Sequence, residues 1–342
     1  MARKGIFGRL LRLFVLLLVV AACGVGYLWM RTQQFADRPI EFADGEKILE
    51  VAPGDGFADV MRKLRGIGIA EGSDLEWRLL ARRMKVASRL QVGEYGITSG
   101  MSPRTILQRM HDGRVIQRKF TIIEGWSFRD LRAALLADAR LRHEIGALND
   151  GEIMQRLDRK GVFPEGRFLP ETYLFTRNTS DLDILRQAAV AMDKALAEAW
   201  AARAQGLPLQ TPDELLTLAS IVEKETGLAS ERPQIAGVFV RRLQIGMRLQ
   251  TDPTVIYGIG SAYDGNIRRR DLETDTPYNT YTRDGLPPTP IAMPGKASLE
   301  AAVRPAPTKA LYFVARGDGS SEFSDDLAAH NRAVNQYQRG AK

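Results

Sequence analysis

Cysteine and histidine are scarce in this sequence of 342 residues. The only cysteine is Cys23, and the three histidines, His111, His143 and His330, are far apart and match no metal-ligand spacing such as HExxH. One cysteine cannot form an intrachain disulfide. The GxxxxGK[ST] phosphate loop and the GxSxG nucleophile elbow are also missing. These absences argue against a metalloenzyme or a cysteine hydrolase, and we expect neither a metal nor a cofactor.

The net charge of +7 is unevenly distributed along the chain. Residues 1–31 contain five basic residues and no acidic one, which leaves 43 basic and 41 acidic residues in the rest. Nucleic-acid-binding proteins concentrate lysine and arginine on one face, and a nearly balanced body lacks that signature. We therefore expect no nucleic-acid partner. Hydrophobic residues, at 44%, suffice for a packed core, and the length predicts two folded units.

One long apolar run lies near the N-terminus. Residues 13–30, LFVLLLVVAACGVGYLWM, carry no charge, and at about 1.5 Å per residue a helix of this length nearly crosses a hydrocarbon core of about 30 Å. Four basic residues precede the run and only Arg31 follows it. By the positive-inside rule, this predicts a single-pass helix in the cytoplasmic (inner) membrane, with residues 1–12 as a cytoplasmic tail and the rest in the periplasm or outside the cell.

A cleaved signal peptide is the alternative, because Ala21-Ala22-Cys23 resembles a lipoprotein processing site. Apolar residues continue to Met30, however, where a mature lipoprotein would turn polar. The pattern therefore favours an uncleaved anchor. In either case the bulk of the chain works outside the cytoplasm, where ATP, NAD and nucleic acids are scarce.

The exported part begins with residues 31–45, which are polar and aperiodic and are expected to form a linker. Residues 46–117 predict a small module with the order β-α-α-β-α, whose last helix starts at a Ser102 cap and ends at Gly113. The segment VAPGDGFADV at 51–60 recurs as IIEGWSFRDL at 122–131, each copy a strand, a glycine turn and a helix. Such duplicated units form binding modules or are a recurrent local fold without a ligand.

Residues 118–342 have a mixed α and β pattern and are expected to form the larger domain. Their periodicity predicts helices at 127–137, 181–203, 212–225 and 232–245, and a short buried strand at 311–315. Residues 274–305 are rich in proline and glycine and predict a loop, and loops of that length are more often functional than idle. The predicted fold class is α+β.

A carboxylate suited to chemistry lies in the predicted helix at 212–225. Thr211 is a strong N-cap, and Glu214 three residues later would complete a capping box. At 100° per residue, Glu223 falls beside Leu216 and Ala219 on the buried side of the helix, near its C-terminus. Desolvation and the helix dipole both disfavour the anion there, so we expect a raised pKa and a general acid.

Two alternatives for this helix stay open. Glu223 could instead form a structural ion pair with an arginine. Glu225, between Leu218 and Ile221, has a claim similar to that of Glu223, and helical geometry alone does not choose between the two.

Amides, hydroxyls and tyrosine rings gather downstream, at 250–257 and 278–281. A sugar site needs such groups, because sugars offer hydroxyls for hydrogen bonding and apolar C–H faces for stacking. Tyrosine and asparagine in proline-rich loops are equally common as turn residues, so composition alone is a weak signal.

Five segments together resemble one known family. They are PEGRFLPETY at 164–173, LASIVEKET at 218–226, ERPQIAGVFVRRLQIGMRLQTDPTVIYG at 231–258, TPYNTYTRDGLPPTPIAMPG at 276–295 and LYFVARGDG at 311–319. With them the chain resembles the endolytic murein transglycosylases, the YceG-like family, over nearly its whole length. The resemblance includes the anchor helix and implies a LysM-like module at 46–117 and a catalytic transglycosylase domain at 118–342.

The resemblance implies a lytic cut of the MurNAc-GlcNAc β-1,4 bond inside nascent peptidoglycan strands, beside peptidoglycan synthases (penicillin-binding proteins). The first glutamate of IVEKE, Glu223 rather than Glu225, would protonate the leaving glycosidic oxygen. Its carboxylate would then take a proton from the C6 hydroxyl of MurNAc, which closes a 1,6-anhydro ring and terminates elongation. No second carboxylate is needed, unlike in most glycosidases. The motif positions imply six residues that hold the glycan: Gln250, Thr251, Asp252, Tyr257, Tyr278 and Asn279.

One element departs from the family pattern. Ser321 stands where family members commonly have the histidine of a Gly-x-His-x-Phe-like element, which puts any role of that histidine here in doubt. A non-catalytic scaffold whose LysM-like module binds peptidoglycan beside the synthesis machinery is therefore an alternative. A hydrolytic muramidase, which would need a water-activating carboxylate such as Asp252, is a third hypothesis.

Overall fold

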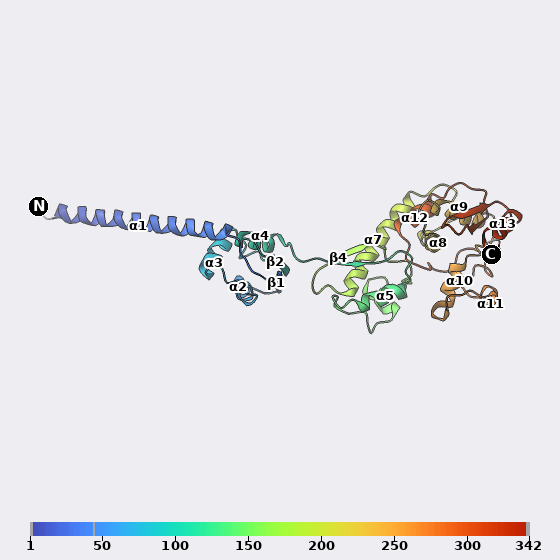
Figure 1. Ribbon diagram of the computed structural model, residues 1–342, viewed down its shortest axis with the longest axis horizontal. Helices are drawn as coiled ribbons and strands as arrows, with labels where there is room; N and C mark the ends of the chain where they lie inside the picture. The colour runs from blue at the N-terminus through green and yellow to red at the C-terminus, as the bar shows by residue number, and fades with distance from the viewer. Residues whose placement is uncertain (1–2, 44, 340–342) are drawn as a thin grey trace. The chain divides into compact units, whose positions relative to one another are not determined.

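The computed structural model describes residues 3–43 and 45–339 (Figure 1). Its contacts divide the chain into two compact units, residues 1–118 and residues 119–342. Each unit has its own hydrophobic core, one in the first unit and two neighbouring clusters in the second. The described elements mix helices and short two-stranded sheets, as the predicted α+β class requires.

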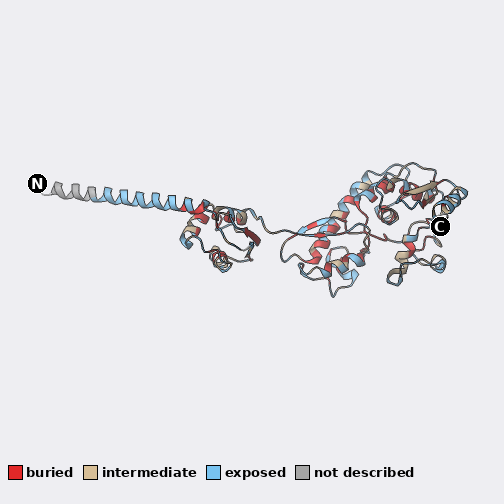
Figure 2. Cartoon of the chain, in the orientation of Figure 1, coloured by how far each residue is buried: buried red, intermediate tan, exposed pale blue. Residues whose placement is uncertain are grey.

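The chain begins with the long helix α1 (Arg3–Asp37). Within it, Leu13–Asp37 is long and apolar enough to cross a membrane and contains an 18-residue stretch with a mean hydropathy of 2.4, and residues 13–30 are exposed (Figure 2). A signal sequence would pass the same test of length and composition. The helix is therefore consistent both with the predicted uncleaved anchor and with a cleaved signal peptide.

The prediction of a linker at 31–45 is wrong for its first part, because the last turns of α1 lie there. Residues 31–37 are helical, and Phe35 and Ala36 are buried in the first unit. The Phe35 ring packs edge-to-face on Trp77, with ring centroids 5.2 Å apart. Gly72, at φ +72°, leaves room for this ring, because a Cβ there would lie 2.1 Å from it. Only the segment after Asp37 connects α1 to the first strand.

The first unit follows the predicted order β-α-α-β-α. Strands β1 and β2 pair antiparallel, with Leu49 opposite Tyr95. The last helix begins at Ser102, whose hydroxyl accepts the Thr105 N–H, and ends at Gly113 with φ +68°, as predicted. The elements are β1 (Glu46–Val51), α2 (Phe57–Gly66), α3 (Asp74–Arg83), β2 (Gly93–Thr98) and α4 (Pro103–Asp112). This order is confirmed, whereas a LysM-like character remains a prediction.

The second unit is mainly helical. The predicted helices at 127–137, 181–203, 212–225 and 232–245 are confirmed within two residues at their ends, and so is the strand at 311–315, although only Val314 of that strand is buried. Residues 274–305, predicted as loop, contain helix α12 (Lys296–Val303) in their last third, and that part of the prediction is wrong.

The first elements of the second unit are β3 (Arg118–Thr121), α5 (Phe128–Ala137), α6 (Asp150–Arg156), β4 (Thr172–Phe175), α7 (Asp181–Ala201), α8 (Pro212–Glu225) and α9 (Arg232–Gln244). They are followed by α10 (Asp252–Ile259), η1 (Gly260–Ala262), α11 (Arg269–Glu273), α12 (Lys296–Val303), β5 (Tyr312–Ala315), β6 (Ser321–Ser324), α13 (Leu327–Val334) and η2 (Asn335–Arg339).

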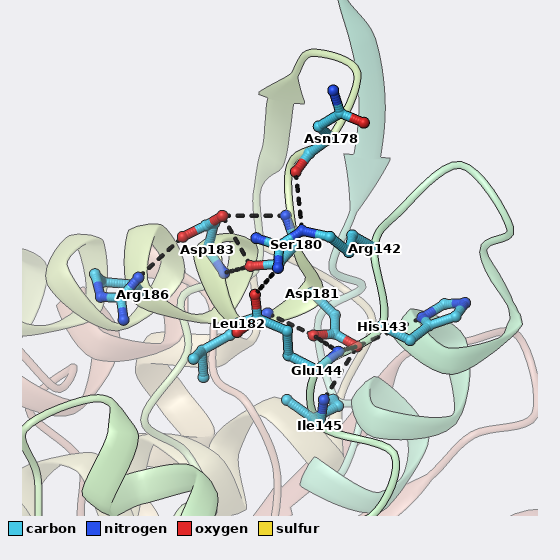
Figure 3. Close-up of polar contacts among 10 residues, drawn as sticks. All are labelled: Arg142, His143, Glu144, Ile145, Asn178, Ser180, Asp181, Leu182, Asp183 and Arg186. Atoms are coloured by element: carbon cyan, nitrogen blue, oxygen red, sulfur yellow. Dashed lines mark hydrogen bonds and ion pairs between the residues drawn. The ribbon is translucent and has the colours of Figure 1, made fainter. Parts of the chain in front are cut away.

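A buried carboxylate at the start of α7 ties this helix to the segment after α5 (Figure 3). Asp181 is fully buried and accepts the backbone N–H groups of Glu144 at 3.0 Å, Leu182 at 2.8 Å and Ile145 at 3.5 Å. Ser180 caps the helix in a reciprocal bond with Asp183. The carboxylate lies at the positive end of the helix dipole, so three amides and the dipole offset its desolvation.

We expect Asp181→Asn to lower the free energy of unfolding of the second unit by about 2 kcal/mol, because the amide offers one acceptor oxygen and turns an N–H group toward a backbone donor. Urea unfolding followed by circular dichroism measures this loss. The matched control is Asp183→Asn, which weakens the half-buried capping pair with Ser180 and should cost about half as much. Equal losses in the two variants would contradict the role assigned to Asp181.

Candidate active site

Helix α8 is the central element of the candidate site. Thr211 accepts the Glu214 N–H at 3.2 Å and starts the helix. The Glu214 carboxylate accepts the N–H of Gln210 instead of that of Thr211, so the predicted capping box forms in only one direction. All residues from 215 to 222 are buried, and the helix packs against α7, α9, α10 and α12.

The side chain of Glu223 is only 5% exposed, as the helical geometry predicts, although the residue as a whole is half-buried. One carboxylate oxygen accepts the Gly295 N–H at 2.9 Å. The other lies 3.6 Å from a guanidinium nitrogen of Arg232, which is also 3.7 Å from Glu124. The ion pair that we raised as an alternative is therefore present, but at this distance the guanidinium is shared between two carboxylates and makes no hydrogen bond to either.

A cavity of about 700 Å³ opens beside α8. Glu223 does not line it directly, but Gly125 and Lys224 do. A Cβ on Gly125 would lie 3.7 Å from the Lys224 side chain and 4.0 Å from Cγ of Glu223. Glu223 is thus placed at the edge of the cavity. The lining residues are Gly125, Ser127, Phe128, Arg129, Asp130, Asp150, Phe163, Pro164, Glu165, Lys224, Pro253, Ile256, Tyr257, Gly260, Ser261, Tyr263, Tyr278 and Ile291.

Two of the six glycan-binding candidates line this cavity. The rings of Tyr257 and Tyr278 pack against one another at 62°, with centroids 4.8 Å apart. The Tyr278 hydroxyl is hydrogen-bonded to that of Thr289 at 2.8 Å. Aromatic faces beside a cavity are suited to stacking on the apolar faces of sugars.

The other four candidates are not brought to the cavity. Thr251 is buried and donates to Glu225, and Asp252 accepts the Tyr281 hydroxyl at 2.6 Å. Asn279 is 1% exposed, and its amide donates to the carbonyls of residues 271, 272 and 274, which holds the end of α11. Gln250 is exposed with φ +47°. These residues shape the fold around the site.

The structure adds a carboxyl that sequence reasoning missed. Glu165 is 3% exposed and lines the cavity. It accepts the Phe128 N–H at 3.0 and 3.1 Å and the Tyr257 hydroxyl at 3.0 Å. Burial raises its pKa to about 7. The sequence offered one signal for Glu165, its position between Pro164 and Pro170 in PEGRFLPETY. We used that segment only as part of the family resemblance.

Glu225, the rival of Glu223, also has a pKa raised to about 7 by burial. It accepts the Thr251 hydroxyl, but it does not line the cavity. Its surroundings are therefore those of a half-buried structural carboxyl.

Ser321 has a structural partner. Its N–H and hydroxyl donate to the two carboxylate oxygens of buried Glu231, at 2.7 and 2.8 Å, which ties β6 to the start of α9. Arg232, whose guanidinium lies 3.6 Å from Glu223, directly follows Glu231 in the chain. Ser321 thus supports the chain segment that carries this arginine.

The model of the YceG-like family matches residues 49–336. The chain belongs to the YceG-like family. Endolytic murein transglycosylase from Bacillus subtilis (strain 168) is 32% identical over 75% of each chain. The protein of that name from Streptococcus pneumoniae serotype 2 (strain D39) is 32% identical over 51% of this chain and 32% of the pneumococcal one.

A solved structure agrees with this relationship. The crystal structure of a YceG-like protein from Listeria monocytogenes superposes with a TM-score of 0.55 and 28% identity, over 85% of this chain and 99% of that one. The YceG-like fold is therefore shared across most of the chain.

In this YceG-like protein, stability should depend on the ionisation of Glu225. Because its pKa is raised above the ordinary value of 4.5 to about 7, its contribution is fully present below about pH 4.5 and is lost as the pH rises through about 7. Glu225→Gln removes the titration and keeps an acceptor for Thr251. We expect the fall in melting temperature between pH 5 and pH 8 to shrink by about 3 °C, the effect of about 1 kcal/mol in a unit of this size.

The matched control for this measurement is Glu273→Gln, whose side chain is 62% exposed in a surface ion pair with Arg269. It should leave the pH dependence of the melting temperature unchanged. A Glu225→Gln variant with the same pH dependence as the wild type would exclude a titrating buried carboxyl at this position.

Proposed function

We propose that this protein is a membrane-anchored endolytic peptidoglycan transglycosylase. It cleaves the MurNAc-GlcNAc β-1,4 bond within nascent strands and leaves 1,6-anhydro-MurNAc ends, which terminates glycan elongation. The observation that carries the proposal is a buried carboxylate, Glu223, at the edge of a tyrosine-lined cavity. Relatives named endolytic murein transglycosylase support the reaction class.

Glu223 acts first as a general acid and then as a general base. It donates its proton to the leaving glycosidic oxygen, and the C6 hydroxyl of MurNAc then attacks C1 while the carboxylate takes the hydroxyl proton. The Gly295 N–H and the nearby Arg232 stabilise the carboxylate between these two steps. Tyr257 and Tyr278 supply ring faces for the sugars.

Helix α1 supports the proposed membrane position. With residues 1–12 in the cytoplasm, the exposed apolar run spans the membrane and the two folded units lie outside the cytoplasm. Trp29 at the end of the run suits the outer interface, and Arg83 of α3 lies over its ring at 5.8 Å. This contact favours a first unit that stays close to the membrane surface, where nascent strands emerge and where the penicillin-binding proteins implied by the family would act as partners.

Glu223→Gln should abolish cleavage, a loss of at least a thousandfold, with little change in folding, because the amide keeps the volume and cannot donate an acidic proton. Incubation of residues 31–342 with uncrosslinked glycan, followed by mass spectrometry, measures this. The wild type should give internal cuts that end in anhydro-muramic sugars. Glu225→Gln is the matched comparison and should retain cleavage.

The products separate the competing functions. Reducing ends in place of anhydro ends would indicate a hydrolytic muramidase. Wild-type protein that binds glycan without cutting it would indicate a scaffold. Equal turnover by the Glu223→Gln variant would exclude Glu223 as the acid.

The orientation can be tested with cysteine labelling. In a Cys23→Ala background, a cysteine that replaces the exposed Glu198 should react with a membrane-impermeant maleimide added outside spheroplasts. A cysteine at position 2 should react only after lysis. The reverse pattern would contradict the proposed topology.

A further inference from the structure

Glu165 is held at the cavity by two different helices. Its carboxylate accepts the N–H of Phe128, the first residue of α5, and the hydroxyl of Tyr257 in α10. The adjacent Gly166 adopts φ +77°, and a Cβ there would lie 2.6 Å from Pro290, so the backbone beside Glu165 packs closely against the segment that contains Pro290. The carboxyl therefore has a defined direction relative to Tyr257.

The charges around Glu165 do not include a direct cationic partner. In the described part of the chain, no lysine or arginine lies within ion-pair distance of its carboxylate, and burial outweighs the backbone N–H groups in setting its pKa at about 7. Nearby Asp130 acts in the same direction. The ionisable groups that share the cavity are Arg129 and Asp130 of α5, Asp150 of α6, Lys224 of α8, Tyr257 of α10, and Tyr263 and Tyr278 from the segments that follow it.

The protonation of Glu165 sets what Tyr257 offers to the cavity. Burial raises the pKa of Tyr257, so its single hydroxyl proton stays in place near neutral pH. An ionised Glu165 accepts that proton in a hydrogen bond and leaves only lone pairs on the phenol oxygen. A protonated Glu165 donates to the phenol oxygen instead, and the Tyr257 O–H is then free to point at a bound molecule.

We propose that Glu165 is a positioning residue that directs the hydroxyl of Tyr257 to donate to an acetamido carbonyl oxygen of the bound glycan. Sugar hydroxyls can reverse their own direction to match either state of Tyr257, whereas a carbonyl oxygen can only accept. Binding of the N-acetyl groups of the glycan should therefore depend on whether Glu165 is protonated. This inference rests on the proposed function and adds a substrate contact and its support to the same site.

Glycan binding by the Glu223→Gln variant tests the inference without cleavage. Fluorescence anisotropy of labelled, uncrosslinked glycan should show binding about tenfold weaker at pH 8.5 than at pH 5.5, which is the effect of one hydrogen bond. A second substitution, Glu165→Gln, supplies an amide donor to Tyr257 at every pH, so tight binding should persist at pH 8.5. Tyr257→Phe should bind weakly at both pH values.

Asp150→Asn is the matched control, because it removes another carboxylate of the same cavity, one paired with Arg132. It should keep the pH dependence of the parent. Binding that is independent of pH in the parent, or that falls equally in the Glu165→Gln variant, would overturn the inference alone. An absence of glycan binding by both the wild type and the parent at every pH would overturn the proposed function as well.

Discussion

The burial of helix α8 is the constraint on which the site depends. Eight consecutive residues of this helix are buried, and four other helices pack against it. The glutamates at its C-terminal end therefore have protein groups as neighbours: Gly295 and Arg232 beside Glu223, and Thr251 beside Glu225. Because the same packing brings Gly125 against the last turn of α8, the edge of the cavity and the carboxylate of Glu223 are positioned together.

Burial alone does not identify the group that does chemistry in this protein. Glu165 and Glu225 both have a pKa raised to about 7 by desolvation, yet only Glu165 lines the cavity. Glu165 and Glu223 each accept a backbone N–H, but Glu223 also has a guanidinium 3.6 Å away, which suits the charged carboxylate of the proposed mechanism. The candidate site thus contains two carboxyls with different surroundings: Glu223 lies beside a guanidinium, and Glu165 lies beside a tyrosine hydroxyl.

The first unit shows how local polarity can mislead. Residues 31–45 are polar and aperiodic, which is typical of a linker, but Phe35 and Ala36 extend α1 into the core beside Trp77. A helix that continues without a break from the apolar run into a packed unit couples the orientation of that unit to the orientation of the run. By contrast, the helix that starts at Ser102 and ends at Gly113 was predictable, because its cap, its apolar face and its left-handed glycine are all local signals.

The sequence by itself determined the helices with strong caps, the enclosure of the Glu223 side chain on one helix face, the long apolar segment and the family, since each depends on neighbours within a few turns or on long motifs. It could not choose among the six glycan-binding candidates, nor find Glu165. Whether a polar side chain faces a cavity or closes a loop, as Tyr257 and Asn279 respectively do, depends on segments distant in the chain. The two partners of Glu165, Phe128 and Tyr257, lie 37 and 92 residues away. Only tertiary packing, which sets desolvation and hydrogen-bond partners at once, decided these roles.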